Sequence, residues 1–219
     1  NNLKSICEEN GYYIHIEKLD ASKYGVPQNR KRVFLVGEKM PDAFVRYTFP
    51  TPDENYSDAP STVRGAIYDL IEKEWEEISN HVWDKLSDKN KERIRSLKEG
   101  QGRDSLPLHL QIPSQIKNPN HRHLDTYGRL CWDEPAPTIT ARFDSFSRGR
   151  FGHPVLDRTI SLREGARIQT FPDDFEFSGT KVSVARQIGN AVPPLLAEKL
   201  GISLLELINR QEKIVANVS

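Results

Sequence analysis

The sequence predicts an α/β fold, and three features of the chain support this prediction. Residues Val33 to Val36 form a continuous apolar run, typical of a strand covered on both faces inside a parallel sheet. Between Gln101 and Pro154, short strand-like segments alternate with Pro, Gly, Asn and His, which indicates a loop-rich, mostly β region. After Pro193 the leucines recur at helical spacing, so a helix should pack on an apolar surface.

The composition is that of a globular protein. The 219 residues are 37% hydrophobic and 28% charged, and 31 Lys and Arg residues balance 31 Asp and Glu residues. Because no net charge attracts the chain to nucleic acid or membranes, any contact with nucleic acid must be local. The sequence shows no apolar stretch of membrane-spanning length and no secretion signal, so we expect a cytoplasmic location.

The cysteines and histidines do not predict a metal site. Two cysteines are too few for a zinc site or a disulfide framework, and we expect Cys7, in a helical pattern, and Cys131, in a strand pattern, to be packing residues. His121 and His123 are spaced like a metal-binding pair, but no third ligand stands near them. We therefore expect no bound metal.

The N-terminal elements follow from local patterns. Residues 2–9 indicate the end of a helix that Gly11 closes, and residues 12–20 alternate as in a strand. A second strand should follow within "YGVPQNRKRVFLVG", residues 24–37. Because side chains alternate between the faces of a strand, three polar groups should share one face at its start, namely Gln28, Arg30 and Arg32.

The middle of the chain begins with a predicted domain boundary. Residues 41–60 are rich in Pro, Asp and Ser, which indicates an irregular crossing between two regions. Residues 62–71 and 87–100 each resemble a surface helix. Residues 128–132 and 137–143 resemble short strands.

Two helices are predicted near the C-terminus. Ser161 and Glu164 form a capping-box pattern that opens a helix ending at Pro172. Pro193 and Pro194 suit the start of a last helix. Its apolar positions are Leu195, Leu196, Leu200, Leu204, Leu205 and Ile208.

Three segments together resemble a known family. They are "YGVPQNRKRVFLVG", "RTISLREGARIQTFPDDFEF" and "QIGNAVPPLLAEKLG", and in this order they are similar to the last three sequence blocks of the cytosine-C5 DNA methyltransferases. That family carries its variable target-recognition region between the first two of these blocks, where this chain has a long gap.

The resemblance implies a specific α/β architecture. We expect the C-terminal part of a Rossmann-like S-adenosylmethionine methyltransferase sheet plus a small, mostly β target-recognition domain. Residues 1–45 would end the catalytic domain, residues 46–178 would form the recognition domain, and residues 179–219 would return to the catalytic domain.

The resemblance also implies roles for the first block. In this family an enzyme cysteine adds to C6 of an extruded cytosine, and C5 is then methylated from S-adenosyl-L-methionine while charge develops on the ring. Arg32 would donate to the ring O2, Arg30 would hold neighbouring backbone, and Gln28 would support the pocket. On residue type alone, the triplet could equally be a salt-bridged strand edge.

The last block lies against the cofactor in this family. The resemblance therefore implies that Asn190 and Ala191 contact S-adenosyl-L-methionine and that Gly189 is a position of close packing. The same residues would also serve a turn before a proline-started helix. The middle block, residues 158–177, is interpreted as scaffold because its capping box and alternating charges explain most of it.

The loop at residues 137–154 is predicted to contact DNA. It combines arginines, serines, Phe143 and Phe146 with one acidic residue, Asp144, which suits contacts to phosphates and base edges. Thr138-Ile139 matches the Thr-aliphatic signature of the family's recognition region. The alternative is a solvated basic loop. The DNA-binding candidates are Thr138, Arg142, Ser145, Ser147, Arg148 and Arg150.

Three segments of a complete enzyme of this family are not found in the chain: a Gly-containing cofactor loop, a Pro-Cys pair with the nucleophile, and a Glu-Asn-Val segment. We therefore expect the C-terminal half of a bacterial restriction-modification methyltransferase, inactive alone. Its partners would be double-stranded DNA and an N-terminal half, in the same polypeptide or as a separate subunit.

Two other interpretations stay open. The chain could be a non-catalytic DNA-binding or specificity module of the same origin. The transfer-RNA-methylating branch of the superfamily is a more distant alternative, because the Cys-Phe-Thr segment of that branch is not found. We also expect the isolated chain to self-associate through apolar surface that a missing sheet would cover.

Overall fold

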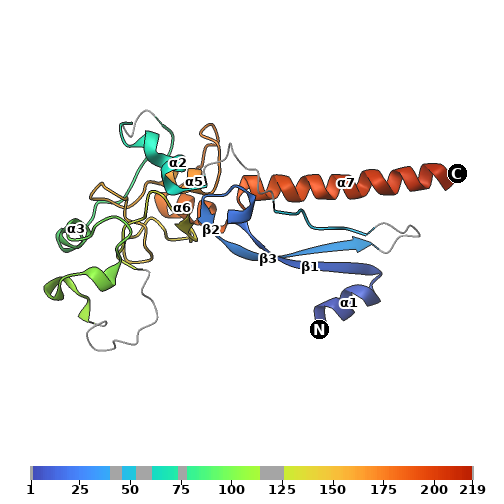
Figure 1. The fold of residues 1–219 in the computed structure, drawn as a ribbon, viewed down its shortest axis with the longest axis horizontal. Coiled ribbons are helices and arrows are strands. Elements are labelled where there is room, and N and C mark those ends of the chain that lie inside the picture. The colour runs from blue at the N-terminus through green and yellow to red at the C-terminus, as the bar shows by residue number, and fades with distance from the viewer. Residues whose placement is uncertain (1, 40–45, 53–60, 74–77, 114–125, 219) are drawn as a thin grey trace.

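The computed structural model describes residues 2–39, 46–52, 61–73, 78–113 and 126–218. A loop-rich body lies at one end of the molecule, and a β-hairpin and a long helix extend from it side by side (Figure 1). The C-terminus lies at the far end of the long helix, and the N-terminal helix folds back beside the hairpin. None of the helices in these described ranges is long and apolar enough to cross a membrane.

The predicted N-terminal elements are confirmed. Helix α1 (Asn2–Glu9) is followed by Gly11, whose φ of 78° is a left-handed conformation that glycine adopts without strain. Strand β1 (Tyr12–Asp20) then pairs with β3 (Lys31–Lys39) in an antiparallel hairpin.

The expectation that residues 33–36 are covered on both faces within a parallel sheet is wrong for the described chain. β3 is antiparallel to β1, and Val33 and Leu35 are 67% and 43% exposed. Phe34, on the opposite face, packs against a small apolar cluster that includes Leu196. Because alternate side chains of a strand point to opposite faces, one face of the apolar run is buried and the other faces solvent.

A short turn positions the start of β3. The 3₁₀ helix η1 (Ala21–Tyr24) ends at Gly25, and β2 (Gln28–Asn29) follows. β2 pairs in parallel with β4 (Ala136–Pro137), so two segments far apart in sequence meet here. Arg30 separates β2 from β3, and its side chain turns into the body, as does that of Gln28, whereas Arg32 is exposed.

The prediction of a mostly β region between residues 101 and 154 is wrong for its described part. β4 is two residues long, the predicted strand at 137–143 becomes a turn, and the predicted strand at 128–132 contributes only an isolated bridge between Arg129 and Gly152.

Buried arginines take the place of strand ladders in this region and around α5 (Leu162–Ile168). Backbone carbonyl groups that lie away from water need donors, and a guanidinium supplies several in a fixed geometry. Arg129 donates to the carbonyls of Ile94, Leu97, His153 and Leu156. Arg163 donates to those of Ser79, Pro172 and Phe175. Irregular backbone is thereby buried without regular strands.

The short helices of the body contribute to its core. Helix α2 (Val63–Ile67) continues into η2 (Tyr68–Leu70), and α3 (Asp88–Arg95), η3 (Arg103–Ser105) and η4 (Leu108–Leu110) follow. The prediction that residues 62–71 form a surface helix is confirmed over residues 63–70: Arg64 and Tyr68 are exposed, and the apolar side chains are buried among those of α5 and α6. These side chains are Val63, Ala66, Ile67 and Leu70.

The C-terminal helices build the rest of the core. Helix α5 (Leu162–Ile168) has the predicted capping box, in which Ser161 Oγ accepts from the Glu164 N–H and Glu164 accepts from the Ser161 N–H. Helix α6 (Lys181–Asn190) was not predicted, although Thr180 caps its first turn. Its buried side chains join the main core beside α2 and α5 (Figure 1).

Helix α7 (Pro194–Val218) begins at the predicted prolines but is buried only in part. Leu196 is buried under the hairpin, with Leu195 and Leu200 beside it. Farther along, Leu205 is 60% exposed, and Leu204 and Ile208 are also exposed. Polar contacts hold the middle of α7, where Tyr47 Oη lies 2.8 Å from Ser203 Oγ.

Candidate functional site

A cavity of about 180 Å³ lies where β3 leaves the body and α7 begins. It is lined by Arg30 and Arg32 at the start of β3 and by Asn190 and Ala191 at the end of α6. The remaining wall is apolar, formed by Val33, Phe34, Val192, Pro193 and Leu196. The cavity thus combines two cations, one amide side chain and an apolar surface.

Arg30 forms the floor of this site and is a structural cation. Its Nη1 donates to the Ile139 carbonyl at 2.9 Å, and its Nη2 donates to the carbonyls of Gly189 and Ala191, both at 3.0 Å. Burial, and then the nearby Arg32 charge, lower the pKa of Arg30 to about 10, so it stays protonated at neutral pH. Arg30 joins β3, the 138–140 segment and the end of α6.

Arg32 is the exposed cation at the cavity. Within the described residues, the hydrogen bond of its side chain joins Nη1 to the Lys31 carbonyl at 2.8 Å. A guanidinium has five N–H donors, so Arg32 retains donors for a group that enters the cavity.

The end of α6 brings Asn190 to the wall of the cavity. Gly189 is buried against the backbone of the 138–141 segment, and a Cβ at this position would lie 2.2 Å from the Thr140 carbonyl oxygen. Gly189 therefore packs against backbone of this chain, and its place at the cofactor stays a prediction. Asn190, one residue later, is exposed.

Gln28 lies behind the cavity and does not line it. Its Oε1 accepts from the Ile139 N–H at 3.0 Å, and its Nε2 donates to Gln169 Oε1 at 2.6 Å. Thr138 Oγ1 donates to the Asn29 carbonyl at 2.6 Å. The Thr138-Ile139 pair is therefore fixed on β2, at the base of the strand that carries Arg32.

The predicted DNA-contacting loop is anchored at several points. Phe143 and Phe146 are buried in two different apolar clusters, so the expectation that they belong to the DNA-contacting surface is wrong. Arg142 Nε donates to the buried Asp144 carboxylate at 2.9 Å, and Arg150 Nη1 donates to the Gly100 carbonyl at 2.8 Å. Large aromatic side chains pack inward because their burial outweighs exposure on a polar loop.

Two of the remaining candidates of this loop, Ser145 and Ser147, are half-buried. Ser145 and Ser147 lie with their hydroxyl oxygens 3.2 Å apart. Arg148 is exposed. His121 and His123 lie outside the described residues.

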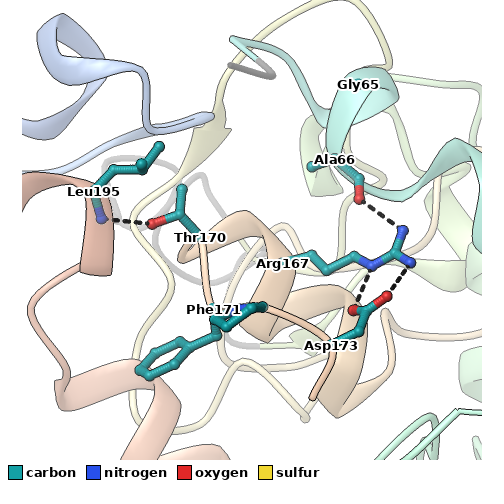
Figure 2. Close-up of a pocket in the computed structure, with 8 residues that line it drawn as sticks. Gly65, Ala66, Arg167, Thr170, Phe171, Asp173 and Leu195 are labelled. Carbon is teal, nitrogen blue, oxygen red and sulfur yellow. Dashed lines mark hydrogen bonds and ion pairs between the residues drawn. The ribbon is translucent and has the colours of Figure 1, made fainter. Parts of the chain in front are cut away.

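A second cavity, of about 350 Å³, lies between α2, the end of α5 and the start of α7. Figure 2 shows Arg167 held by the Asp173 carboxylate and the Ala66 carbonyl, with the Thr170 hydroxyl facing the Leu195 amide. Asp69 also accepts from Arg167 at 2.5 Å. Because these polar groups are paired with one another, the smaller cavity at Arg32 is the better candidate site.

A buried ionic cluster of Arg158, His153 and Glu164 of α5 was not predicted from the sequence, although the capping box had identified Glu164. Arg158 makes two hydrogen bonds to Glu164, at 2.7 and 2.8 Å. His153 Nδ1 accepts from the Val155 and Leu156 N–H groups, which leaves the proton on Nε2. Burial lowers the pKa of His153 to about 4, so the ring is neutral at pH 7.

Cys131 does not have the features of a nucleophile. Cys7 and Cys131 are free and partly buried. The Cys131 thiol donates to Glu99 Oε1 at 3.4 Å, and burial together with this carboxylate raises the pKa of Cys131. A catalytic cysteine needs a lowered pKa.

Comparison with known proteins identifies the relatives of this chain. Residues 1–206 match the family model of the C-5 cytosine-specific DNA methylases. A type II methylase of Herpetosiphon aurantiacus is 33% identical over 98% of the chain, and a type II methyltransferase of Bacillus subtilis is 38% identical over 93%. The chain spans only 62% and 46% of these two relatives.

Solved structures agree on the fold. The chain superimposes on an E. coli prophage-encoded protein described as a DNA modification methyltransferase, with a TM-score of 0.55 and 23% identity over 92% of this chain and 62% of the other. The Dnmt2 methyltransferase of S. pombe gives a TM-score of 0.50 with 15% identity over 93% and 58% of the two chains. With a family match over nearly its whole length, the chain belongs to the C-5 cytosine-specific DNA methylase family.

Proposed function

We propose that this chain is the C-terminal portion of a DNA (cytosine-5-)-methyltransferase that uses S-adenosyl-L-methionine. It would supply target recognition, one side of the pocket for the extruded cytosine and part of the cofactor site. One observation carries the proposal: Arg32 and Asn190, from opposite ends of the sequence, line the same cavity.

Arg32 would stabilise the charge that develops on the base. Addition of a cysteine to C6 of cytosine moves electron density onto O2 and N3, and a cation that donates to O2 stabilises this state. Arg32 is exposed at the cavity and retains donors, whereas Arg30 uses its donors on three carbonyl groups. We therefore propose Arg32 as the catalytic cation, Arg30 as its support, and Gln28 as the anchor of β2.

Asn190 and Ala191 would contribute to the cofactor site. An amide side chain both donates and accepts, as the charged amino-acid end of S-adenosyl-L-methionine requires, and the apolar wall suits its carbon framework. When bound, the cofactor would supply the methyl group. The cavity of about 180 Å³ supports a partial cofactor site, which the rest of the enzyme would complete.

The loop-rich body would read the DNA. Arg148 and the serines at 145 and 147 would contact phosphates or bases, and Arg142 and Arg150 would reach the DNA from their anchored positions. Thr138 would act at the edge of this surface, where it is fixed to β2. In this proposal residues 46–178 form the recognition domain and residues 1–45 with 179–219 belong to the catalytic domain. The two proposed domains share one apolar core, since side chains of α6 pack in the same cluster as those of α2 and α5.

The nucleophile would come from an N-terminal half, because neither cysteine here follows a proline and Cys131 has a raised pKa. That half would also cover the exposed face of β3 at Val33 and Leu35. We propose a bacterial restriction-modification setting, in line with the type II names of the relatives.

A complementation assay tests the proposal. The chain is combined with a matching N-terminal half, and tritiated-methyl transfer to DNA is measured for Arg32→Ala and Asn190→Ala. Loss of the Arg32 donor should lower kcat by roughly 10²–10³-fold. Arg210→Ala, an exposed arginine on α7, is the matched control and should retain full activity. Full activity in both site variants would instead favour the non-catalytic DNA-binding module.

A further inference from the structure

Gln169, directly after α5, is a buried residue that the sequence did not single out. We propose that Gln169 is a positioning residue for methyl transfer. With Gln28 it holds the Thr138-Ile139 segment and the end of α6 in register with the strand that carries Arg32. This inference rests on the proposed function and adds a residue from the segment interpreted above as scaffold.

A chain of hydrogen bonds carries the proposal. The Ile139 N–H donates to Gln28 Oε1 at 3.0 Å, Gln28 Nε2 donates to Gln169 Oε1 at 2.6 Å, and Gln169 Nε2 donates to the Ile188 carbonyl at 2.6 Å. Both glutamines are completely buried. Buried polar chains of this kind are well defined only when every member has a partner, as here.

Backbone groups fix the direction of this chain. The Ile139 N–H can only donate and the Ile188 carbonyl can only accept, so each amide has one permitted orientation. A glutamate in place of Gln169 has the same shape but no donor when ionised. Its carboxylate would then face the Ile188 carbonyl oxygen, and the chain would break at that point.

Both ends of the chain lie next to proposed functional groups. Ile139 follows Thr138, and its carbonyl also binds Arg30. Ile188 lies two residues before Asn190 on α6. A shift at Gln169 would therefore move the recognition segment and the cofactor wall relative to Arg32. Displacement of reacting groups by about 1 Å can cost roughly 10²-fold in rate.

The first test is kinetic and uses the enzyme that contains this chain together with its N-terminal half. At pH 8 and saturating DNA and cofactor, we expect Gln169→Glu to lower kcat by about tenfold to a hundredfold, with the DNA KM changed less than about twofold. Gln187→Glu makes the same change at an exposed position of α6, where water can replace the hydrogen bond from Nε2 to the Ser178 carbonyl, so this variant should match the wild type.

A pH shift separates broken hydrogen bonding from general destabilisation. Burial raises the pKa of a carboxyl group, so the side chain introduced by Gln169→Glu should be protonated to a greater extent at pH 6 than at pH 8. In its protonated form this carboxylic acid can accept from Gln28 and donate to the Ile188 carbonyl. We therefore expect kcat of the variant, relative to wild type, to recover partly at pH 6. Unchanged kcat at pH 8, or an effect confined to KM, would overturn the proposal.

The second test needs no activity. Hydrogen exchange of the Ile139 amide in this chain should accelerate in Gln169→Glu and stay unchanged in Gln187→Glu. If Ile139 exchange does not change, the proposal is overturned. If the wild-type enzyme transfers no methyl group, the proposed function fails, while the exchange result still decides whether Gln169 holds Ile139. Should Gln169→Glu not fold by circular dichroism, Gln169→Met replaces it in both tests.

Discussion

Two parts of the molecule are held together by different kinds of contact. The junction, defined as residues 28–30, 138–141, 169 and 188–191, joins distant segments through buried side-chain hydrogen bonds. The arm, defined as β1, β3 and α7, is made of contacts between neighbouring elements and leaves Val33, Leu35 and Leu205 exposed. The junction is formed by contacts within this chain, whereas the arm has apolar surface that none of the described residues covers.

The cavity at Arg32 lies where these two parts meet. Arg30, Asn190 and Ala191 belong to the junction, whereas Arg32 and most of the apolar wall come from β3 and the start of α7. The difference teaches that this chain alone fixes the positions of the polar groups at the cavity. It also suggests where a partner would add to the site, which is on the side of the arm.

The largest expected effect comes from a methyl group placed in the junction. Gly189→Ala would put Cβ at 2.2 Å from a backbone carbonyl oxygen, which cannot move like a flexible side chain. We expect destabilisation of about 3 kcal/mol or more. Gly201→Ala on α7, where no atom lies within 4 Å of the new Cβ, should stabilise by about 0.5 to 1 kcal/mol. Urea unfolding of both variants measures this contrast, and equal effects would contradict it.

The free energy of unfolding should depend on pH through His153, which lies in the body. The folded pKa of His153 is about 4, below the 6.5 of the unfolded chain, so the unfolded state binds the extra proton. His153 therefore contributes stability above pH 6.5 that is lost as the pH falls toward 4, about 2 to 3 kcal/mol in all. Below this window the loss continues, because pairing with Arg158 outweighs burial and lowers the pKa of Glu164.

Tryptophan fluorescence can follow this pH effect, since Trp132 packs edge-on against His153 with ring centroids 5.3 Å apart. Urea unfolding at pH 7 and pH 4.5 should show the loss in the wild type and in His109→Gln, an exposed control. His153→Gln should be less sensitive to pH between these values. An equal pH dependence in all three proteins would show that His153 is not the group responsible.

Substitutions of the two arginines at the cavity should change the free energy of unfolding by different amounts. Arg30→Lys keeps the charge but cannot reach three carbonyl groups with a planar fork, so we expect a loss of about 2 kcal/mol. Arg32→Lys, at an exposed position with one local bond, should change stability by less than about 0.5 kcal/mol. Thermal unfolding measures both, and a similar loss for the two would contradict the assignment of Arg30 as the structural cation.

The sequence predicted what local patterns encode. Gly11, the capping box at Ser161 and the prolines before α7 mark element ends through backbone chemistry, and all three predictions are confirmed. Arg32 and Asn190 were named from the family resemblance, and the fold brings them to one cavity.

Burial and long-range pairing were not predictable in the same way. Residues 62–71 have an amphipathic pattern that predicts a surface helix, and only the fold shows that α5 and α6 cover its apolar face. Gln169 looks like any polar residue at a helix end, because its partners Gln28 and Ile188 come from other parts of the chain. The β content was overestimated because buried arginines such as Arg129, instead of strands, pair the loop carbonyls.

The smallest effect on folding is expected on the arm, and there it carries the most information about a partner. Val33→Ser changes a side chain that is 67% exposed, so the free energy of unfolding of this chain should change by less than about 0.5 kcal/mol. If an N-terminal half covers β3, the same variant should weaken its binding by up to about tenfold, because it removes the burial of roughly a valine side chain. Titration calorimetry of the two halves measures this, with Leu108→Ser as the control, because Leu108 is an apolar side chain of the body that is 74% exposed. Equal affinity for Val33→Ser and wild type would mean that the exposed face of β3 stays uncovered in the enzyme.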